Sequence, residues 1–421
     1  MIKHASALTR HTSNLRTDTR APSALHSFPH ARFSFADIAM TTASVTLDTL
    51  DTPCLLLDET RMTRNIERLN RLMAGHGVQL RPHLKTPKSI EVARRVMARP
   101  EGPAAVSTLQ EAEQFAAAGV TDLLYAVGVA PAKLERVLAL RRGGVDLTVV
   151  VDSVEAAQAV AARALEEGAA IPALIEIDCD GHRAGVQPGQ AGQLLEIARA
   201  LHAAGCLRGV MTHAGESYGC RSVEAIADMA EQERLAAVGC AETIRAAGLP
   251  CPVVSVGSTP TAHFARNLEG VTEVRAGVYV FFDLVMAGLG VCAVDDIAAS
   301  VLTTVIGHQP DKGWILVDAG WMAMSRDRGT ARQPVDQLYG LVCDVDGQVY
   351  PDLLLAETNQ EQGIIKLRAG SGAALPDLPL GTRLRIVPNH ACATCAQHDA
   401  YAVVRSGDRQ VVAQWQRFRG W

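Results

Sequence analysis

Apolar runs and helical segments alternate regularly over the middle of the chain. Short apolar runs occupy residues 79–85, 104–108, 122–127, 147–152, 173–178, 209–213, 252–257 and 273–279. Longer segments such as LQEAEQFAAAG and VEAAQAVAARALEEG separate them, and their apolar residues recur at helical spacing. Continuous apolar strands joined by helices are typical of a parallel sheet buried on both faces. About eight such units in about 200 residues predict a closed (β/α)8 barrel, with a doubly wound open sheet as the alternative.

The polar residues of this region cluster where the apolar runs end. His83 and Lys85 close the first run, His213 ends the sixth, and Ser258 and Thr259 follow the seventh. The carboxyl ends of barrel strands share one rim, where active sites are built. The pattern therefore favours an enzyme over a binding or scaffold protein.

The pattern changes after about residue 295. Segments such as VLTTVIGHQ, GWILVDAG and TRLRIVPNH are typical of strands and are separated by Gly, Asp and Pro turns. We predict a second, mainly antiparallel β domain, with which the early segment TPCLLLDE pairs. The predicted division is an extension over residues 1–46, a barrel over 60–290, and a β domain built from 47–59 and 291–421.

Composition narrows the class of protein. Hydrophobic residues make up 48% and charged residues 20% of the chain, as in globular enzymes. A net charge of −5 provides no basic field that would attract nucleic acid or anionic lipid. No apolar run reaches the roughly 18 residues that a membrane span needs. Ten cysteines without a repeated spacing favour reduced thiols and a cytoplasmic protein.

Residues 1–39 differ from the rest, because they are rich in Arg, His and Ser and lack apolar periodicity. We interpret them as a disordered extension, or as the product of a start codon upstream of Met40. An organellar targeting peptide is the alternative. In each case they lie outside the predicted fold.

Candidate chemistry begins with RPHLKTPKS, residues 81–89. Lys85 ends a strand at the predicted rim beside His83 and Lys88. A partly desolvated lysine among cations has a lowered pKa and can form a Schiff base. A solvated surface charge is the ordinary alternative.

Two glycine-containing turns indicate a phosphate site. VGSTPT (256–261) and RAGVY (275–279) end the last two barrel strands. The last two barrel loops commonly bind phosphate through backbone N–H groups, and Ser258 and Thr259 would add hydroxyl donors. Two structural glycine turns are the alternative. A lysine Schiff base opposite a phosphate site indicates pyridoxal phosphate as the cofactor.

A glycine turn also precedes Arg183 in DCDGHRAGV. From this position its guanidinium can reach over a cofactor ring and hold a phenolic oxygen ionised. A surface arginine is the alternative.

The segment PNHACATCAQHD carries candidate metal ligands. We predict that His390 and Cys392 alternate in an extended segment, so that both side chains point the same way. Imidazole and thiolate suit zinc, and two protein ligands leave positions open for water and substrate. Because Cys395 completes a CxxC with Cys392, a redox pair or a structural zinc site is the alternative. His398 and Asp399 are further candidate ligands.

Together these motifs resemble the fold-type III pyridoxal-phosphate enzymes that include D-threonine aldolase and the metal-dependent D-serine dehydratases. The resemblance extends from about Asp51 to Trp421 and rests on DTPCLLLD, RPHLKTPKS, STLQEAEQFAAAG, DGHRAGV, THAGESY, LPCPVVSVGSTPT, GVTEVRAGVYVFFD, VDAGWMAMSRDRGT and PNHACAT. It implies an alanine-racemase-like barrel followed by the β domain, in a homodimer with the active site near the subunit interface.

The resemblance also implies roles for individual residues. Lys85 is expected as the Schiff-base lysine, Arg183 beside the phenolic oxygen of the cofactor, and His213 beside its ring. The phosphate is expected among Ser258, Thr259, Gly277 and Tyr279, and Zn²⁺ or another divalent metal on His390 and Cys392.

The metal pair separates two activities within this family. Dehydratases carry His-x-Cys where the similar aldolases carry His-x-Asp. We therefore expect the chain to convert a small D-β-hydroxy amino acid, 3-hydroxy-D-aspartate or D-serine, into a keto acid and ammonia. The alternative is a D-threonine aldolase, which would release glycine and an aldehyde. A racemase of this fold would need no zinc, and a non-catalytic cofactor carrier would resemble the barrel alone.

Two features bear on substrate and rate. Relatives usually read QEHG where this chain has QEQG, and Gln362 forms hydrogen bonds but cannot titrate. A second substrate carboxylate would require a cation near the metal, for which Arg326 and Arg328 are candidates, with a surface charge or a structural ion pair as the alternative.

Overall fold

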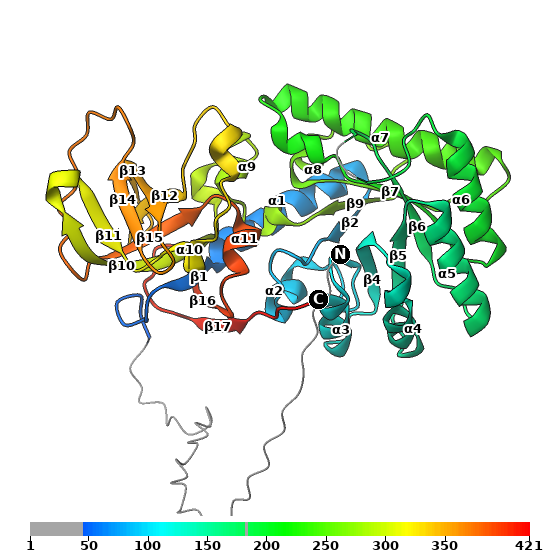
Figure 1. The fold of residues 1–421 in the computed structure, drawn as a ribbon, viewed down its shortest axis with the longest axis horizontal. Helices are drawn as coiled ribbons and strands as arrows, with labels where there is room; N and C mark the ends of the chain where they lie inside the picture. Colours follow the sequence, from blue (N-terminus) through cyan, green and yellow to red (C-terminus); the bar gives the residue numbers. More distant parts are fainter. Residues whose placement is uncertain (1–44, 182–183) are drawn as a thin grey trace, which may run out of the picture. The chain divides into compact units, whose positions relative to one another are not determined.

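The computed structural model describes residues 45–181 and 184–421. The expectations for the N-terminal extension fall outside these residues, apart from its last two positions. Within the described chain, hydrogen bonding forms two sheets, one with eight strands and one with nine. The first is built from the middle of the chain, and the second from its beginning and end (Figure 1).

All pairings of the first sheet are parallel, and helices alternate with its strands. The strands are β2 (Gln79–Pro82), β3 (Ala104–Val106), β4 (Asp122–Gly128), β5 (Asp146–Val151), β6 (Ala173–Ile177), β7 (Leu207–Thr212), β8 (Val253–Val256) and β9 (Glu273–Ala276). The helices are α1 (Glu59–His76), α2 (Ile90–Val96), α3 (Leu109–Ala117), α4 (Leu134–Arg142), α5 (Val154–Glu167), α6 (Ala191–Ala203), α7 (Val223–Ala246) and α8 (Thr259–Phe264).

This sheet closes on itself. Its order runs β2-β9-β8-β7-β6-β5-β4-β3, so β2 and β3 are its two ends. Just beyond β2, His83 forms a parallel bridge with Ala105, and the Leu84 N–H donates to the Ala105 carbonyl at 2.8 Å. The prediction of a closed barrel is confirmed, and the open-sheet alternative is wrong.

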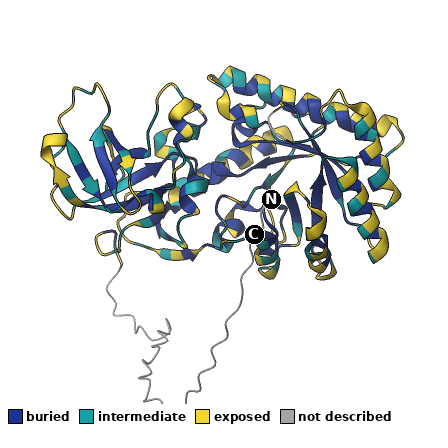
Figure 2. Ribbon diagram, viewed as in Figure 1, coloured by how far each residue is buried: buried dark blue, intermediate teal, exposed yellow. Residues whose placement is uncertain are grey.

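Helix α1 illustrates why the local sequence folds in this way. Its buried apolar residues Met62, Ile66, Leu69 and Met73 are spaced to form one stripe. Asp58 caps the first turn by accepting a hydrogen bond from the Arg61 N–H at 3.0 Å. The helix ends at Gly77, whose φ of 68° is the left-handed conformation that glycine adopts readily. Figure 2 shows the same division for the outer helices, with a buried face and an exposed face.

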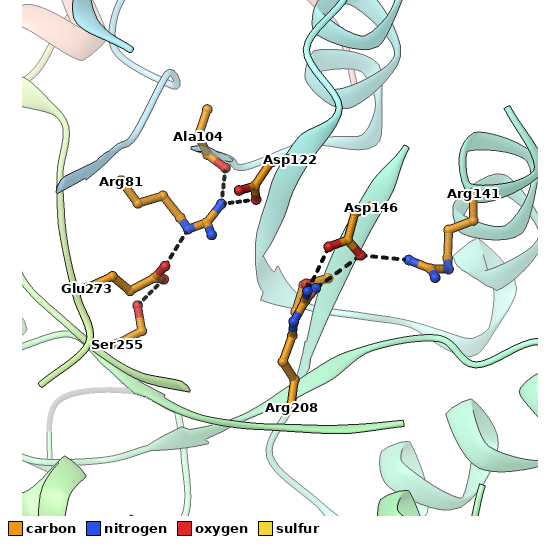
Figure 3. Close-up of polar contacts among 9 residues, drawn as sticks. Arg81, Ala104, Asp122, Arg141, Asp146, Arg208, Ser255 and Glu273 are labelled. Atoms are coloured by element: carbon orange, nitrogen blue, oxygen red, sulfur yellow. Dashed lines mark hydrogen bonds and ion pairs between the residues drawn. The ribbon is translucent and has the colours of Figure 1, made fainter. Parts of the chain in front are cut away.

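A charged network fills the part of the barrel where the strands begin (Figure 3). Arg81 of β2 contacts Glu273 of β9 at 2.8 Å and Asp122 of β4 at 2.7 Å. Next to it, Arg208 of β7 contacts Asp146 of β5 at 2.7 Å. Each charge faces an opposite charge, which matters most for Arg81 and Glu273, whose side chains are 13% and 7% exposed. The network therefore lies at the end of the barrel opposite to the one where the strands finish.

The second sheet is antiparallel except where β1 pairs with β16. Its strands are β1 (Cys54–Asp58), β10 (Ala299–Gln309), β11 (Trp314–Val317), β12 (Gly340–Asp344), β13 (Val349–Thr358), β14 (Gly363–Leu367), β15 (Arg383–Pro388), β16 (Ala400–Val404) and β17 (Ala413–Gln416). The short helices α9 (Leu284–Gly288), α10 (Trp321–Met324) and α11 (Ala391–Cys395) lie among them in sequence. The expected antiparallel β domain is confirmed. None of the helices in the described residues is long and apolar enough to span a bilayer.

Candidate functional site

A cavity of about 440 Å³ lies where the barrel strands end. Part of the lining comes from the barrel, in or directly after β2, β3, β4, β7, β8 and β9. The rest comes from later segments and consists of Asp283, Val285, Met286, Asp327, Gly329, His390 and Cys392. Of the nine residues that the sequence predicts for the site, the cavity lining brings together seven. They are Lys85, His213, Ser258, Thr259, Gly277, His390 and Cys392. Tyr279 is fully buried close by in sequence, and Arg183 lies outside the described residues.

Lys85 follows β2, and its surroundings distinguish it from the second lysine of the motif. Lys88 forms an ion pair with the buried Glu111 at 3.0 Å, whereas Lys85 lines the cavity. The Lys85 N–H lies 3.4 Å from Nδ1 of His83. Burial lowers the pKa of His83 well below its usual value, and the charges of Lys85 and Arg275 lower it further. A neutral imidazole therefore supports the loop that presents the lysine.

Ser258 and its neighbours form a polar wall after β8. Ser258 caps helix α8, because its Oγ accepts a hydrogen bond from the Thr261 N–H at 3.2 Å. The Ser258 hydroxyl also contacts Ser217 Oγ at 2.9 Å. The buried Thr259 Oγ1 and Tyr279 hydroxyl form no hydrogen bond with any described residue. Since buried polar groups are normally satisfied, two such orphans suit a bound polar group.

Gly277 occupies a position where a side chain would be crowded. A Cβ added there would lie 3.1 Å from the His83 carbonyl oxygen and 3.2 Å from His83 Cβ. Gly257, after β8, has a φ of 130°, and an added Cβ would lie 2.3 Å from the Arg275 carbonyl oxygen. At both turns the backbone therefore packs closely against neighbouring strand ends, which leaves no room for a side chain.

His213 is fixed by the turn after β8. Its Nδ1 lies 3.0 Å from the Gly257 carbonyl oxygen, and because a carbonyl only accepts, Nδ1 carries the proton. Glu233 of α7 supports the same two loops, since its Oε1 accepts from the N–H groups of Ala214 at 2.9 Å and Gly257 at 3.0 Å. The imidazole is thereby held at one side of the cavity.

The prediction of an extended segment for His390 and Cys392 is wrong. His390 is the residue before α11, with extended backbone angles, and Cys392 lies in the first turn of that helix. The reason is tertiary, because Asp283 of the adjoining segment accepts a hydrogen bond from the Ala391 N–H at 3.0 Å and so caps the turn. Both side chains nevertheless line the cavity.

Each member of this pair has a polar partner. His390 Nδ1 lies 2.7 Å from Asp327 Oδ2, and Cys392 Sγ lies 3.1 Å from Thr86 Oγ1. Although burial opposes its charge, the hydrogen bonds to Asp327 and Cys392 raise the pKa of His390 to about 11. Burial raises the pKa of Cys392, but His390 and Lys85 bring it below the usual thiol value. No group of three or more metal-ligating side chains occurs among the described residues, so this pair would leave open positions on a metal.

The other candidates from the sequence do not line the cavity. Cys395 is fully buried, and burial raises its pKa to about 12, which separates it chemically from Cys392. His398 Nε2 donates to the Ala323 carbonyl at 2.9 Å, and the Asp399 side chain is 82% exposed beside Arg419. Gln362 accepts a backbone hydrogen bond from Asn359 through its carbonyl at 2.7 Å.

The two arginines considered for a second substrate carboxylate are engaged elsewhere. Arg328 forms an ion pair with Asp336 at 2.6 Å, and the Arg326 guanidinium lies over the Trp321 ring at 4.4 Å. Neither lines the cavity. For Arg328, the structural ion pair is therefore the correct alternative.

Sequence reasoning missed several residues that shape the site. Arg275, Asp283 and Asp327 line the cavity, and Glu233 and Thr86 support its loops. No local pattern distinguishes Arg275, which shares its strand with Glu273, or Glu233, which is one of several acidic residues of α7. Nothing local distinguishes Asp327 from the other carboxylates of its loop.

Two sequence-family models match the chain. "Alanine racemase, N-terminal domain" matches residues 57–285, and "Putative serine dehydratase domain" matches residues 298–404. The first model covers more than half of the chain. The chain therefore belongs to the family of proteins with an alanine-racemase-like barrel.

Individual relatives narrow this class. D-threo-3-hydroxyaspartate dehydratase from Delftia sp. (strain HT23) is 58% identical over 89% of this chain and 99% of its own length. A solved cysteine-to-alanine mutant of D-threo-3-hydroxyaspartate dehydratase, in the metal-free form, has a TM-score of 0.86 at 56% identity and covers 90% of this chain and 100% of its own. D-serine dehydratase from Dictyostelium discoideum is 29% identical over 89% of this chain and 98% of its own length. D-threonine aldolase from Arthrobacter sp. is also 29% identical, over 85% of this chain and 90% of its own length.

Proposed function

We propose that this chain is a carbon–oxygen lyase that dehydrates a D-β-hydroxy amino acid, 3-hydroxy-D-aspartate or D-serine, to a keto acid and ammonia. The observation that carries the proposal is the convergence of Lys85 and the His390–Cys392 pair in one cavity. The high identity to a D-threo-3-hydroxyaspartate dehydratase supports the same reaction class.

The residues on the barrel side suit pyridoxal phosphate. Ser258, Thr259 and Tyr279 would hold its phosphate, and the unsatisfied hydroxyls of the last two support this assignment. Gly277 lines the same cavity, and its backbone N–H would be a further donor to the phosphate. We assign Arg183 to the phenolic oxygen and His213 to the side of the ring. When bound, the cofactor supplies an electron sink for the charge left on the substrate Cα.

Lys85 has two tasks in this proposal. Its Nζ would hold the cofactor covalently, and with substrate bound the same Nζ would remove the proton from the substrate Cα. The neutral His83 beside it adds no positive charge to the loop.

The opposite wall suits a divalent metal, Zn²⁺ or a related ion. Imidazole and thiolate are ligands that zinc prefers, and two protein ligands would leave positions for water and the substrate hydroxyl. A bound metal would act as a Lewis acid that assists departure of the β-hydroxyl. The solved metal-free form of the D-threo-3-hydroxyaspartate dehydratase mutant supports a metal in this family.

The balance of the reaction is simple. The substrate loses its α-proton and β-hydroxyl as water, and the Cβ–O bond breaks. The resulting enamine tautomerises to an imine, which water hydrolyses to a keto acid and ammonia. D-serine would yield pyruvate, and 3-hydroxyaspartate would yield oxaloacetate.

The proposal extends to domains, assembly and location. We assign the cofactor to a barrel domain over residues 60–290 and the metal ligands to a β domain formed by 47–59 and 291–421. We further propose a cytoplasmic homodimer, because the family resemblance implies a site near a subunit interface and ten free cysteines suit a reducing compartment.

The test is product analysis of the purified chain, loaded with pyridoxal phosphate and Zn²⁺, with D-serine, D-threo-3-hydroxyaspartate and D-threonine offered separately. We expect keto acid and ammonia, lost on chelation and reduced about 100- to 10,000-fold or more by Lys85→Ala. Lys312→Ala is the control, because Lys312 lies between β10 and β11 of the second sheet, where its ammonium group stacks on the Trp314 ring, and it does not line the cavity. Glycine and an aldehyde as products would instead establish the aldolase.

A further inference from the structure

Asp327 and His390 are 63 residues apart in the chain, and their side chains meet at the wall of the cavity. Asp327 Oδ2 lies 2.7 Å from His390 Nδ1, the distance of a strong, charge-assisted hydrogen bond. A carboxylate only accepts, so Nδ1 is the donor and carries a proton. The second ring nitrogen, Nε2, does not take part in this contact.

The tautomer follows from this contact. A neutral imidazole has one protonated nitrogen and one with a free lone pair, and the partner of the first determines which nitrogen is available to a metal. Metal binding would release the proton on Nε2, and because Asp327 keeps the other proton on Nδ1, His390 can offer only Nε2. The hydrogen bond also fixes the rotation of the ring.

The carboxylate of Asp327 is available for this role because the neighbouring arginines have other partners. Arg328 pairs with Asp336, and Arg326 stacks on Trp321. Among the described residues, Asp327 forms no ion pair with either of them. Its own backbone N–H donates to Ser325 Oγ at 3.2 Å, which holds the loop.

Cys392 has a matching support from the barrel side. Thr86 Oγ1 lies 3.1 Å from Cys392 Sγ, and Thr86 is itself fully buried. Each of the two proposed ligands thus has its own hydrogen-bonding support, a carboxylate for His390 and a hydroxyl for Cys392. Of these supports, the Asp327 carboxylate is the one that selects which ring nitrogen of its ligand carries a proton.

We propose that Asp327 is a positioning residue, which holds His390 in the Nδ1-protonated tautomer and presents Nε2 to a divalent metal beside Cys392. This inference rests on the proposed metal site. It concerns metal affinity rather than the chemical step, since Asp327 acts through His390.

The experiment measures Zn²⁺ binding to the full chain carrying pyridoxal phosphate, by competition with a chromogenic chelator after metal removal. Asp327→Ala is expected to weaken zinc binding about 10- to 100-fold, the usual effect of losing such a partner. Asp327→Asn is expected to stay close to the unsubstituted chain, because the amide oxygen can still accept the Nδ1 proton.

Asp399→Ala is the matched control, since it removes a carboxylate near the same segment that is 82% exposed and pairs with Arg419. It should leave the zinc affinity unchanged. Co²⁺ provides a second readout, because thiolate-to-cobalt absorption reports whether Cys392 still binds when His390 is misplaced.

The outcomes separate the two proposals. If the unsubstituted chain binds no zinc, the metal site itself is wrong and the inference falls with it. If it binds zinc and Asp327→Ala binds equally well, the metal site stands and the positioning role is overturned. If Asp327→Asn is as weak as Asp327→Ala, the carboxylate acts through its charge or as a direct ligand, which also overturns the positioning role.

Discussion

At the scale of single residues, Gly277 lines the cavity at a position where an added Cβ would press on His83 and Thr86, the residues on either side of the Lys85 loop. We expect Gly277→Ala to lower the affinity for pyridoxal phosphate about tenfold or more, or about 1.4 kcal/mol. The physical reason is that the new Cβ would stand 3.1 Å from the His83 carbonyl oxygen and 3.4 Å from Thr86 Oγ1. Cofactor titration of the metal-free, cofactor-free chain measures this change.

Gly189→Ala is the control for this substitution, because an added Cβ there would have no heavy atom within 4 Å. If both variants bind the cofactor as tightly as the unsubstituted chain, the close approach at Gly277 has no part in binding.

The structure also gives different surroundings to two cysteines that the sequence places in one motif. Cys392 and Cys395 form a CxxC in sequence, yet one lines the cavity and the other is buried with a pKa raised to about 12. A lone thiol beside an imidazole suits a metal better than a redox pair does.

At the scale of elements, helix α8 is tied to the cavity through its cap. We expect Ser258→Ala to cost about 1 kcal/mol of stability, because Ser258 Oγ accepts from the Thr261 N–H and contacts Ser217. The same change should also weaken cofactor binding, since Ser258 lines the cavity. Thermal unfolding and cofactor titration are the two measurements.

Ser153→Ala separates these effects, because Ser153 caps α5 in the same way, accepting from the Ala156 N–H at 3.2 Å. Ser153 is absent from the cavity lining, so this variant should lose similar stability without losing cofactor affinity. Equal cofactor affinity for both variants would argue against a phosphate contact at Ser258.

At the scale of the whole molecule, the charged network inside the barrel connects strands that are distant in sequence. Arg81→Met is expected to destabilise the chain by about 3 kcal/mol, because it removes the cation that contacts Glu273 and Asp122 directly. The Glu273 side chain is only 7% exposed, so water cannot replace the lost partner. Urea unfolding measures the difference.

Arg266→Met provides the comparison for an exposed pair, since Arg266 and Asp228 are 66% and 76% exposed. Its effect should stay within about 1 kcal/mol. If both variants lose a similar free energy of unfolding, burial does not increase the contribution of the Arg81 network to stability.

By itself, the sequence determined the features that depend on local periodicity and on short motifs. Buried parallel strands carry continuous apolar runs and helices carry apolar stripes, so both sheets and the barrel could be predicted. Lys85, His213, Ser258 and Thr259 follow strands directly, and the topology of a barrel brings such positions to one rim.

Only the tertiary structure decided the parts that join distant segments. Thr86 meets Cys392 across 306 residues and Asp327 meets His390 across 63, and no local pattern encodes either contact. The helix that begins after His390 was missed for the same reason, because its small residues show no periodicity and its cap comes from Asp283, 108 residues earlier. Hydrogen bonds between distant segments depend on how the chain packs, whereas apolar periodicity is already present in each segment.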